Sequence, residues 1–325
     1  MITNLSLPGF KKIEKAHGWK ILDKCSDNLH ETGKNGVKQI LSTGDGKVEL
    51  IGFSEKTLAY VKSEMDYPAY YPIKETNLKK PIKAVLMDLD GTTVHSEEFW
   101  IWIIEKTVAS LTNNETFKFT PEDIPYVSGH SVSEHLCYCI EKYAKNASIK
   151  TAREHYTAHT EQEMNLIMEG KGKPNAFTPA PGIKEFLINL KKENIKIALV
   201  TSGLYRKAYP EIISAFKTLN LGNPEEFYDA IITAGYPLGE GKPGTLGELQ
   251  AKPHPWLYAE ACRVGLNIED RDSVMGIEDS GAGVCALRLA GYTTIGIAGG
   301  NIISSGTRGM CDYYCESFDE ILELL

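Results

Sequence analysis

The acids Asp88 and Asp90 directly follow an apolar run in the segment Ala84-Val85-Leu86-Met87-Asp88-Leu89-Asp90-Gly91-Thr92. A run of this kind is typical of a strand that is buried on both faces, in the middle of a parallel sheet. Negative charge at the mouth of a core is costly unless a cation or a catalysed reaction uses it. Gly91 lets the chain turn sharply away after the second acid. The segment therefore predicts a site in which the two carboxylates serve a cation or catalysis.

Four further strand-like runs follow this segment, and helical patterns separate them. The runs are residues 195–200, 230–233, 273–277 and 293–297, and the helical patterns are residues 182–193, 211–219, 256–264 and 281–289. Strand and helix alternating at this spacing predict an α/β fold, a doubly wound sheet of parallel strands.

Polar residues stand at three of the predicted strand ends. These endings are Asp88-Leu89-Asp90, Thr201-Ser202-Gly203 and Glu278-Asp279-Ser280. Ligands of a doubly wound sheet bind beyond the carboxyl ends of its strands. We therefore expect the three endings to meet at one crevice.

The rest of the chain predicts two additions to a core made of residues 81–93 and 181–325. Residues 94–180 read mostly as helix and predict a cap domain that excludes water and selects the substrate. Residues 1–80 predict a small α+β extension, to which we assign no chemistry. It contains a hairpin around Gly44-Asp45-Gly46, followed by a short helix that Ser54 would cap.

Composition limits the classes of function. The 325 residues carry a net charge of −8, which argues against a nucleic-acid partner. The sequence contains no apolar stretch of membrane-spanning length and does not begin like a signal peptide, so we expect no membrane partner. Seven scattered cysteines favour reduced thiols and a cytoplasmic location. The sequence does not predict the oligomeric state.

Four segments in order resemble the motifs of the haloacid dehalogenase-like hydrolases. They are Asp88-Leu89-Asp90-Gly91-Thr92, Thr201-Ser202-Gly203, Lys252-Pro253 and Gly276-Ile277-Glu278-Asp279-Ser280. Within that superfamily the chain is similar to the beta-phosphoglucomutase and sugar phosphatase branch, whose helical cap follows the first motif. The resemblance covers about residues 82–325 and implies a Rossmann-like core.

The resemblance implies that Asp88 is the nucleophile and forms an aspartyl-phosphate. Asp90 would be the general acid that protonates the leaving oxygen and later activates water. A carboxylate and a phosphate dianion repel each other, so a cation must cancel charge before they approach. The resemblance therefore also implies Mg²⁺, held by Glu278 and Asp279 with the Asp88 side chain and the Asp90 backbone carbonyl.

The two remaining motifs would hold the phosphoryl group. Thr201 would bind it through its hydroxyl and backbone N–H, with the amides of Ser202 and Gly203 beside it. Lys252 would be the cation that steadies it. Lys242 is a rival for that role, because a proline follows it as well. It lies in a glycine-rich stretch, Gly235–Gly247, which we interpret as a loop near the crevice.

These features predict a Mg²⁺-dependent phosphohydrolase for a small phosphorylated metabolite, most readily a sugar phosphate. The alternative is a hexose-phosphate mutase, but the cap arginine that such mutases carry after Gly-x-Ser is missing, because Val132 follows Gly129-His130-Ser131. A phosphonate hydrolase that uses Lys106 to form an imine is a further alternative. So is a catalytically weak binding or regulatory module whose effector part is residues 1–80.

Overall fold

The computed structural model describes residues 4–10, 13–14, 17–62, 68–127, 132–173, 175–233 and 251–325. Packing divides the chain into two compact units. The first consists of Met1–Thr93, Pro181–Tyr205 and Glu225–Leu325, and the second of Val94–Ala180 and Arg206–Pro224. Both glycine-containing segments singled out above, Gly235–Gly247 with Lys242 and Gly129-His130-Ser131, lie outside the described residues.

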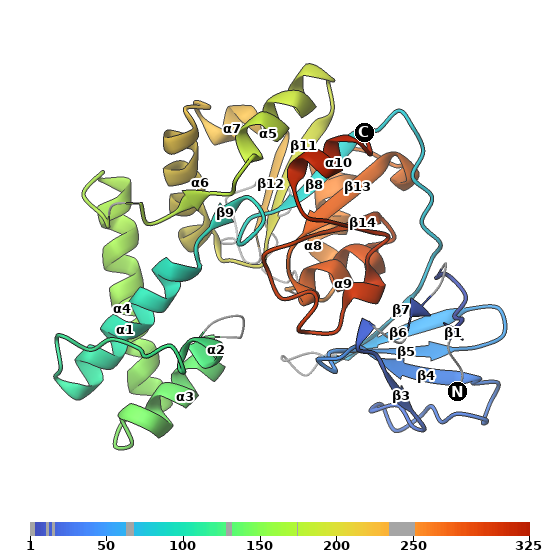
Figure 1. Ribbon diagram of the computed structural model, residues 1–325, viewed down its shortest axis with the longest axis horizontal. Helices are drawn as coiled ribbons and strands as arrows, with labels where there is room; N and C mark the ends of the chain where they lie inside the picture. Colours follow the sequence, from blue (N-terminus) through green and yellow to red (C-terminus); the bar gives the residue numbers. More distant parts are fainter. Residues whose placement is uncertain are drawn as a thin grey trace. The chain divides into compact units, whose positions relative to one another are not determined.

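A six-stranded parallel sheet forms the centre of the first unit, in the order β12-β11-β8-β13-β14-β15 (Figure 1). The strands are β8 (Ala84–Asp88), β11 (Lys196–Thr201), β12 (Ala230–Thr233), β13 (Val274–Glu278), β14 (Thr293–Ile297) and β15 (Tyr313–Cys315). The doubly wound fold is confirmed. On one side of β8 the neighbouring strands are β11 and then β12. On the other side they are β13, β14 and β15. The edge strand β15, which has only three residues, was not predicted.

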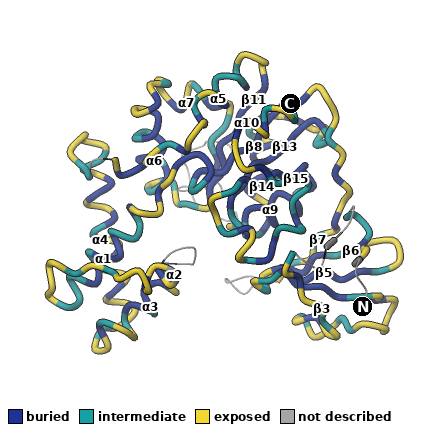
Figure 2. The backbone as a smooth tube through the Cα atoms, in the orientation of Figure 1, coloured by how far each residue is buried: buried dark blue, intermediate teal, exposed yellow. Residues whose placement is uncertain are grey.

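Strand β8 is buried along its whole length, as its apolar composition predicts. Ala84 and Leu86 on one of its faces belong to a core cluster with Leu257 and Tyr258, which lie in the helix that begins at Trp256. Figure 2 shows the central strands as a buried block enclosed by partly exposed helices. Because both faces are covered, only the strand ends can present polar side chains to a ligand.

Three helices of the first unit lie close to their predicted positions: α5 (Ile183–Lys192), α8 (Trp256–Glu260) and α9 (Gly281–Ala290). The short helices α7 (Pro224–Phe227) and α10 (Phe318–Leu322) were not predicted. The predicted helix over 256–264 continues after α8 as a π-helical turn, Ala261–Gly265. Ser280 begins α9, because its side chain accepts a hydrogen bond from the Gly283 backbone N–H.

The first 80 residues fold as an antiparallel five-stranded sheet in the order β3-β4-β5-β6-β7. The strands are β3 (Lys20–Leu22), β4 (Gln39–Ser42), β5 (Val48–Gly52), β6 (Thr57–Val61) and β7 (Ala69–Pro72), and a separate two-stranded ribbon joins β1 (Asn4–Leu5) to β2 (Ile13–Glu14). The hairpin around Gly44-Asp45-Gly46 is confirmed. The helix expected after Ser54 is wrong, because residues 57–61 pair with β5 and β7 as β6.

This sheet buries side chains on both faces, and one face shares a core with α9. Leu41 and Leu50 pack in a cluster with Val284 and Cys285 of α9, whereas Ile40, next to Leu41, faces a second cluster. The alternation follows the two-residue period of a strand. The N-terminal sheet is therefore part of the same compact unit as the parallel sheet.

The second unit is mainly helical. Its elements are α1 (Glu97–Thr112), α2 (Ile124–Val127), α3 (Val132–Tyr143), α4 (Ile149–Met168), most of α6 (Tyr205–Leu219) and the short strands β9 (Val94–His95) and β10 (Thr178–Pro179). The fully buried Asp123 carboxylate accepts hydrogen bonds from Tyr138, Lys142 and Tyr143 of α3. This polar cluster fastens the start of α2 to α3.

Candidate active site

Asp88 is the last residue of β8, at the carboxyl end of the central strand. Gly91, three residues later, has φ +87°, a conformation that side-chain-bearing residues rarely adopt. A Cβ at Gly91 would also lie 2.1 Å from Oδ2 of Asp279, the residue that follows β13. The turn after β8 therefore needs glycine for its backbone conformation and for its close approach to Asp279.

The Lys252 ammonium lies between two carboxylates. Its Nζ is 2.5 Å from Asp88 Oδ1 and 2.6 Å from Glu278 Oε1. The Nζ atom also donates to the Val200 carbonyl at 3.2 Å. Only 5 % of the Lys252 side chain is exposed, so the charge pair is almost fully desolvated. Such a lysine is held in one position by its partners.

Protein donors occupy both carboxylate oxygens of Glu278. The Tyr258 hydroxyl donates to Oε1 at 2.7 Å, beside Lys252. The Ser280 hydroxyl and backbone N–H donate to Oε2 at 3.0 and 3.2 Å. Gly283 makes room for this carboxylate, because a Cβ there would lie 1.8 Å from Glu278. Glu278 is therefore built into the hydrogen-bond framework that holds Lys252.

The electrostatics of the cluster favour an added cation. Burial, reinforced by the charge of Glu278, raises the pKa of Asp88 well above its ordinary range. Burial and the same neighbour raise the pKa of Asp279 to about 8. Burial alone would lower the pKa of Lys252, but the charges of Asp88 and Glu278 outweigh it and raise that pKa. Negative charge therefore remains in excess after Lys252 is counted.

A set of hard oxygen ligands is present at this point. Asp88, Glu278 and Asp279 each offer a carboxylate oxygen, and these oxygens lie within 4.8 Å of one another. Mg²⁺ binds through a small number of carboxylates together with water and substrate oxygens. The residues present therefore fit a magnesium ion, and the excess charge gives a reason to bind one. Among the described contacts, Asp88 and Asp279 each accept fewer hydrogen bonds from the protein than Glu278 does.

The predicted phosphate-binding segment lies beside Lys252. Thr201 is the last residue of β11 and is buried, and its hydroxyl accepts from the Gly203 N–H at 2.9 Å. Ser202 is exposed, and its hydroxyl accepts from the Lys252 backbone N–H at 3.1 Å. The ends of β8, β11 and β13 and the Lys252 loop thus meet, as the sequence predicts.

Asp90 lies two residues after β8 and is half-buried. Its charge contributes to the raised pKa of Asp88, after burial and the charges of Glu278 and Asp279. The loop that carries it is fixed by Thr93, whose hydroxyl donates to the Asp88 carbonyl at 2.6 Å and whose N–H donates to the Leu89 carbonyl at 2.9 Å. Asp90 is therefore held next to Asp88 and is more accessible than it.

Three residues near the cluster were not predicted from the sequence. Tyr258 binds Glu278, and its ring lies 4.9 Å from Lys252 Nζ. His254 lies two residues after Lys252 along the loop and is hydrogen-bonded to Tyr71. Tyr258 sits in an apolar helical pattern, where a tyrosine reads as core. Nothing in the sequence links Tyr71 to a residue so far along the chain.

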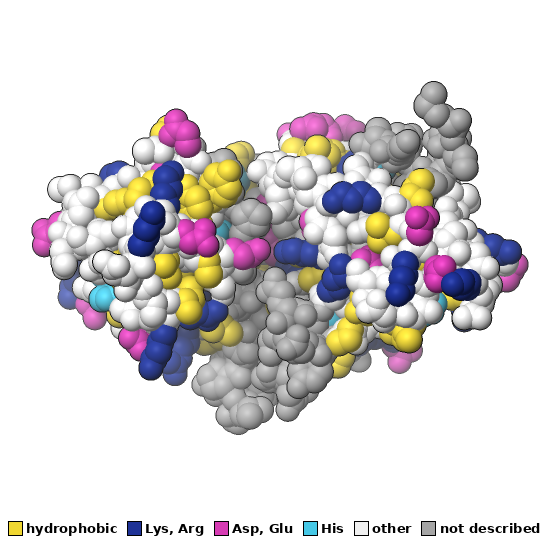
Figure 3. Space-filling model, turned by 90° about the horizontal axis from the view of Figure 1, so that it is seen from below, with side chains coloured by type: hydrophobic (Ala, Val, Ile, Leu, Met, Phe, Trp, Pro, Cys, Tyr) yellow, Lys and Arg dark blue, Asp and Glu magenta, His cyan; other side chains and the backbone are white. Residues whose placement is uncertain are grey.

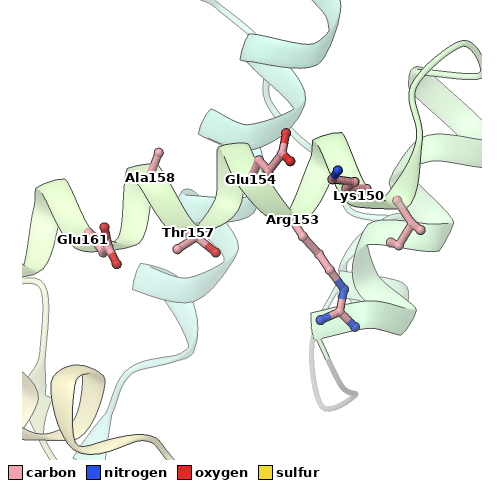
Figure 4. A pocket seen from close by; sticks show the side chains of 7 residues that line it. Lys150, Arg153, Glu154, Thr157, Ala158 and Glu161 are labelled. Atoms are coloured by element: carbon pink, nitrogen blue, oxygen red, sulfur yellow. The ribbon is translucent and has the colours of Figure 1, made fainter.

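A separate hollow of about 690 Å³ lies along α4 in the helical unit (Figure 4). Its lining comes from that helix alone: Ile149, Lys150, Arg153, Glu154, Thr157, Ala158 and Glu161. None of these residues belongs to the four motifs. A one-helix surface offers little enclosure for a small substrate.

The chain belongs to the haloacid dehalogenase-like hydrolase family, whose model matches residues 85–297. It is thus a hydrolase of that family, as its four motifs predict. Beta-phosphoglucomutase from Bacillus subtilis is 28 % identical over 231 residues, covering 67 % of this chain and 84 % of the relative.

Solved structures of the same fold cover most of the chain. A predicted phosphoglycolate phosphatase from Haemophilus somnus has a TM-score of 0.57 at 17 % identity, covering 75 % of this chain and 97 % of that one. CbbY from Rhodobacter sphaeroides, in complex with xylulose 1,5-bisphosphate, has a TM-score of 0.55 at 22 % identity, covering 74 % and 96 %.

The surface carries charges of both signs. On the face drawn in Figure 3, lysine and arginine side chains lie among aspartate and glutamate side chains, with hydrophobic groups between them. None of the helices that the structure describes has the length and apolar character needed to span a bilayer.

Proposed function

We propose that the protein is a Mg²⁺-dependent phosphohydrolase that cleaves a small phosphorylated metabolite, most readily a sugar phosphate, through an aspartyl-phosphate on Asp88. The observation that carries this proposal is the buried Lys252 ammonium, 2.5 Å from Asp88 and 2.6 Å from Glu278 at the carboxyl end of the parallel sheet. A carboxylate can attack a phosphate only where positive charge offsets their repulsion. Lys252 supplies such a charge at the attacking group.

In the first step, a carboxylate oxygen of Asp88 attacks phosphorus and the bond from phosphorus to the ester oxygen breaks. Asp90 gives its proton to the departing oxygen, so that an alcohol leaves. In the second step, Asp90 takes a proton from water, and the water oxygen attacks phosphorus. The bond to Asp88 breaks, which restores the carboxylate and releases inorganic phosphate.

The other residues of the site bind and orient the phosphoryl group. Thr201 would donate its hydroxyl to a phosphoryl oxygen, and the Ser202 and Gly203 backbone N–H groups lie next to it in the chain. Lys252 would contact another oxygen, and Glu278 would keep the ammonium in place. Asp88 and Asp279, with the Asp90 carbonyl, would hold Mg²⁺, and Glu278 completes the acidic set. When bound, Mg²⁺ supplies charge neutralisation for the carboxylates and the phosphate.

A hexose-phosphate mutase is the second candidate, because the Bacillus subtilis relative is a beta-phosphoglucomutase. Val132 stands where such mutases have an arginine after Gly-x-Ser. One side chain that would bind a second phosphate is therefore missing. We therefore favour hydrolysis. Incubation with beta-glucose 1-phosphate separates the two reactions, because a hydrolase releases phosphate and a mutase forms glucose 6-phosphate.

A phosphonate hydrolase that forms an imine is disfavoured by the surroundings of Lys106. Its Nζ lies 2.6 Å from the buried carboxylate of Glu163. The Lys106 amine is held by this carboxylate of α4 and would have to leave it to attack a carbonyl group. We propose instead that the helical unit, which contains residues 94–180, contributes substrate specificity.

A panel of sugar phosphates, nucleotides, phosphonates and p-nitrophenyl phosphate, assayed with Mg²⁺ and with EDTA, tests the proposal. We expect Mg²⁺-dependent phosphate release that EDTA abolishes reversibly. Lys252→Met should lower kcat by at least about a hundredfold, since it removes a charge used in the transition state. Lys191→Met is the matched control, because Lys191 pairs with Asp229 at a half-exposed position. Wild-type protein that cleaves no member of the panel would favour a binding module instead.

A further inference from the structure

The N-terminal sheet reaches the loop that carries Lys252. The Tyr71 hydroxyl, on β7, lies 2.7 Å from Nδ1 of His254. Nε1 of Trp256 donates to the same hydroxyl at 2.9 Å. His254 and Trp256 follow Lys252 by two and four residues and lead into α8. One tyrosine of the N-terminal sheet therefore binds two side chains of residues 251–256, the segment that we call the lysine loop.

The direction of the hydrogen bond from Trp256 is fixed by chemistry. An indole N–H can only donate, so the Tyr71 oxygen accepts from Trp256. The bond between Tyr71 and His254 Nδ1 runs in the direction that the tautomer of the ring sets. Only 4 % of His254 is exposed, and burial lowers its pKa, which agrees with a neutral ring. The three side chains form one hydrogen-bonded cluster.

The lysine loop has little room to move without shifting the Lys252 ammonium. The backbone N–H of His254 donates to the Ala251 carbonyl at 3.1 Å, which closes a turn around Lys252 and Pro253. The Lys252 backbone N–H is tied to Ser202, and its Nζ is tied to Asp88 and Glu278. The position of His254 is thus coupled through two residues of backbone to the cation beside Asp88.

A second contact joins the N-terminal sheet to the other side of the site. At the tip of the β4–β5 hairpin, the Asp45 N–H donates to the Ser305 carbonyl at 2.8 Å, and the Gly44 N–H donates to the Gly306 carbonyl at 3.2 Å. The loop that receives them also contains Gly300, where a Cβ would lie 2.2 Å from Asp279 Oδ2. Both the lysine loop and the loop against Asp279 are therefore braced by the same sheet.

We propose that the N-terminal sheet supports the active site. In this proposal Tyr71 is a positioning residue that fixes the position of the Lys252 ammonium through His254. The inference rests on the proposed function in so far as Lys252 acts on the phosphoryl group. The family match begins at residue 85, so Tyr71 lies outside it and this brace is a feature of the N-terminal extension. It gives residues 1–80 a role within the reaction site.

Tyr71→Phe and Tyr70→Phe form a matched pair of test variants. The two tyrosines are neighbours on β7, and each loses one hydrogen-bonded hydroxyl, because Tyr70 donates to Asp27 at 2.7 Å. Only Tyr71 contacts the lysine loop. We expect Tyr71→Phe to lower kcat for p-nitrophenyl phosphate with Mg²⁺ by about tenfold, the equivalent of about one hydrogen bond. Tyr70→Phe should leave kcat and KM at their wild-type values. Its shift in Tm should be similar to the shift in Tm of Tyr71→Phe.

A second readout follows Lys252 without turnover. The ammonium resonance of Lys252, assigned by its loss in Lys252→Arg, should shift or broaden in Tyr71→Phe and stay unchanged in Tyr70→Phe. In the double variant Tyr71→Phe/His254→Ala, kcat should equal that of His254→Ala, because the two residues act in series.

The outcomes separate the two proposals. If wild-type protein shows no turnover but the Lys252 resonance responds to Tyr71→Phe alone, the proposed function fails and the positioning role stands. If Tyr71→Phe matches Tyr70→Phe in kcat and leaves the Lys252 resonance unchanged, the positioning role is overturned. Additive effects in the double variant would also overturn it.

Discussion

Tyr258 donates its hydroxyl to Oε1 of Glu278 at 2.7 Å, and this is the same oxygen that lies 2.6 Å from Lys252 Nζ. One buried carboxylate oxygen thus receives a neutral donor from α8 and a cation from the preceding loop. Because all three groups are desolvated, each restricts the position of the others.

Tyr258→Phe should therefore weaken both the fold and the reaction. Loss of the hydroxyl leaves part of the Glu278 charge without a donor, which costs about 1–3 kcal/mol of unfolding free energy. We expect kcat to fall by about tenfold as Lys252 gains freedom. Tyr292→Phe is the control, since Tyr292 is buried in the same core cluster and its hydroxyl interacts with Cys262. It should lose stability and keep kcat, and an equal loss of kcat in both variants would contradict the account.

Gly91→Ala should abolish activity while the protein remains folded. The new methyl would combine a φ of +87° with a 2.1 Å approach to Asp279 Oδ2, so Asp279 must move. Gly33→Ala separates the two effects, because Gly33 has φ +84° and open space around its Cβ. The control should lose about 1–2 kcal/mol of stability from backbone strain and retain full kcat. Normal Mg²⁺-dependent turnover in Gly91→Ala would show that Asp279 has no fixed place in the site.

Stability without metal should fall as pH rises. The folded-state pKa of Asp279 is about 8 against an ordinary 3.8, so between these values the folded protein binds more protons than the unfolded chain. The metal-free protein should consequently have a lower Tm near the top of that interval than near its bottom, and Mg²⁺ should restore the difference. In Asp279→Asn, both the slope and the Mg²⁺ effect should shrink. A Tm that Mg²⁺ leaves unchanged at about pH 8 would argue against a cation site here.

Asp123→Asn should remove acid-sensitive stability from the helical unit. Burial opposes ionisation of Asp123, but hydrogen bonds from Lys142, Tyr138 and Tyr143 outweigh it and hold its pKa below the ordinary 3.8. A lowered carboxyl pKa contributes stability above 3.8 that is lost as pH falls through the folded value. Urea unfolding should show a deficit of about 2 kcal/mol in the variant at neutral pH. The two proteins should converge in acid, and a deficit independent of pH would exclude this electrostatic origin.

The sequence predicts five of the six strands of the parallel sheet because each of the five is a short apolar run, and three of them have a polar ending. Residues 230–233 and 293–297 form strands with the predicted limits. The failures have local causes. Residues 57–61 were assigned to a helix after Ser54, but pairing with β5 and β7 decides their conformation. The edge strand β15 is too short to give a periodic signal.

Within the site, the motif residues were predicted and their supporting neighbours were missed. Asp88, Lys252, Glu278 and Asp279 have distinctive positions at strand ends or before a helix. Tyr258 reads as an ordinary core residue, and the partnership of Tyr71 with His254 spans 183 positions of sequence. Such contacts depend on packing of the N-terminal sheet against the core, which a single sequence does not encode in any local pattern.

The direct test of the central claim is to trap the phosphorylated enzyme. Wild-type protein is mixed with Mg²⁺ and a substrate from the panel, quenched in acid during turnover and analysed by peptide mass spectrometry. We predict one added phosphoryl group on the peptide that contains Asp88, and none in Asp88→Asn, which should release no phosphate. Phosphate release by Asp88→Asn at the wild-type rate, or a phosphoryl group on a different residue, would contradict the account.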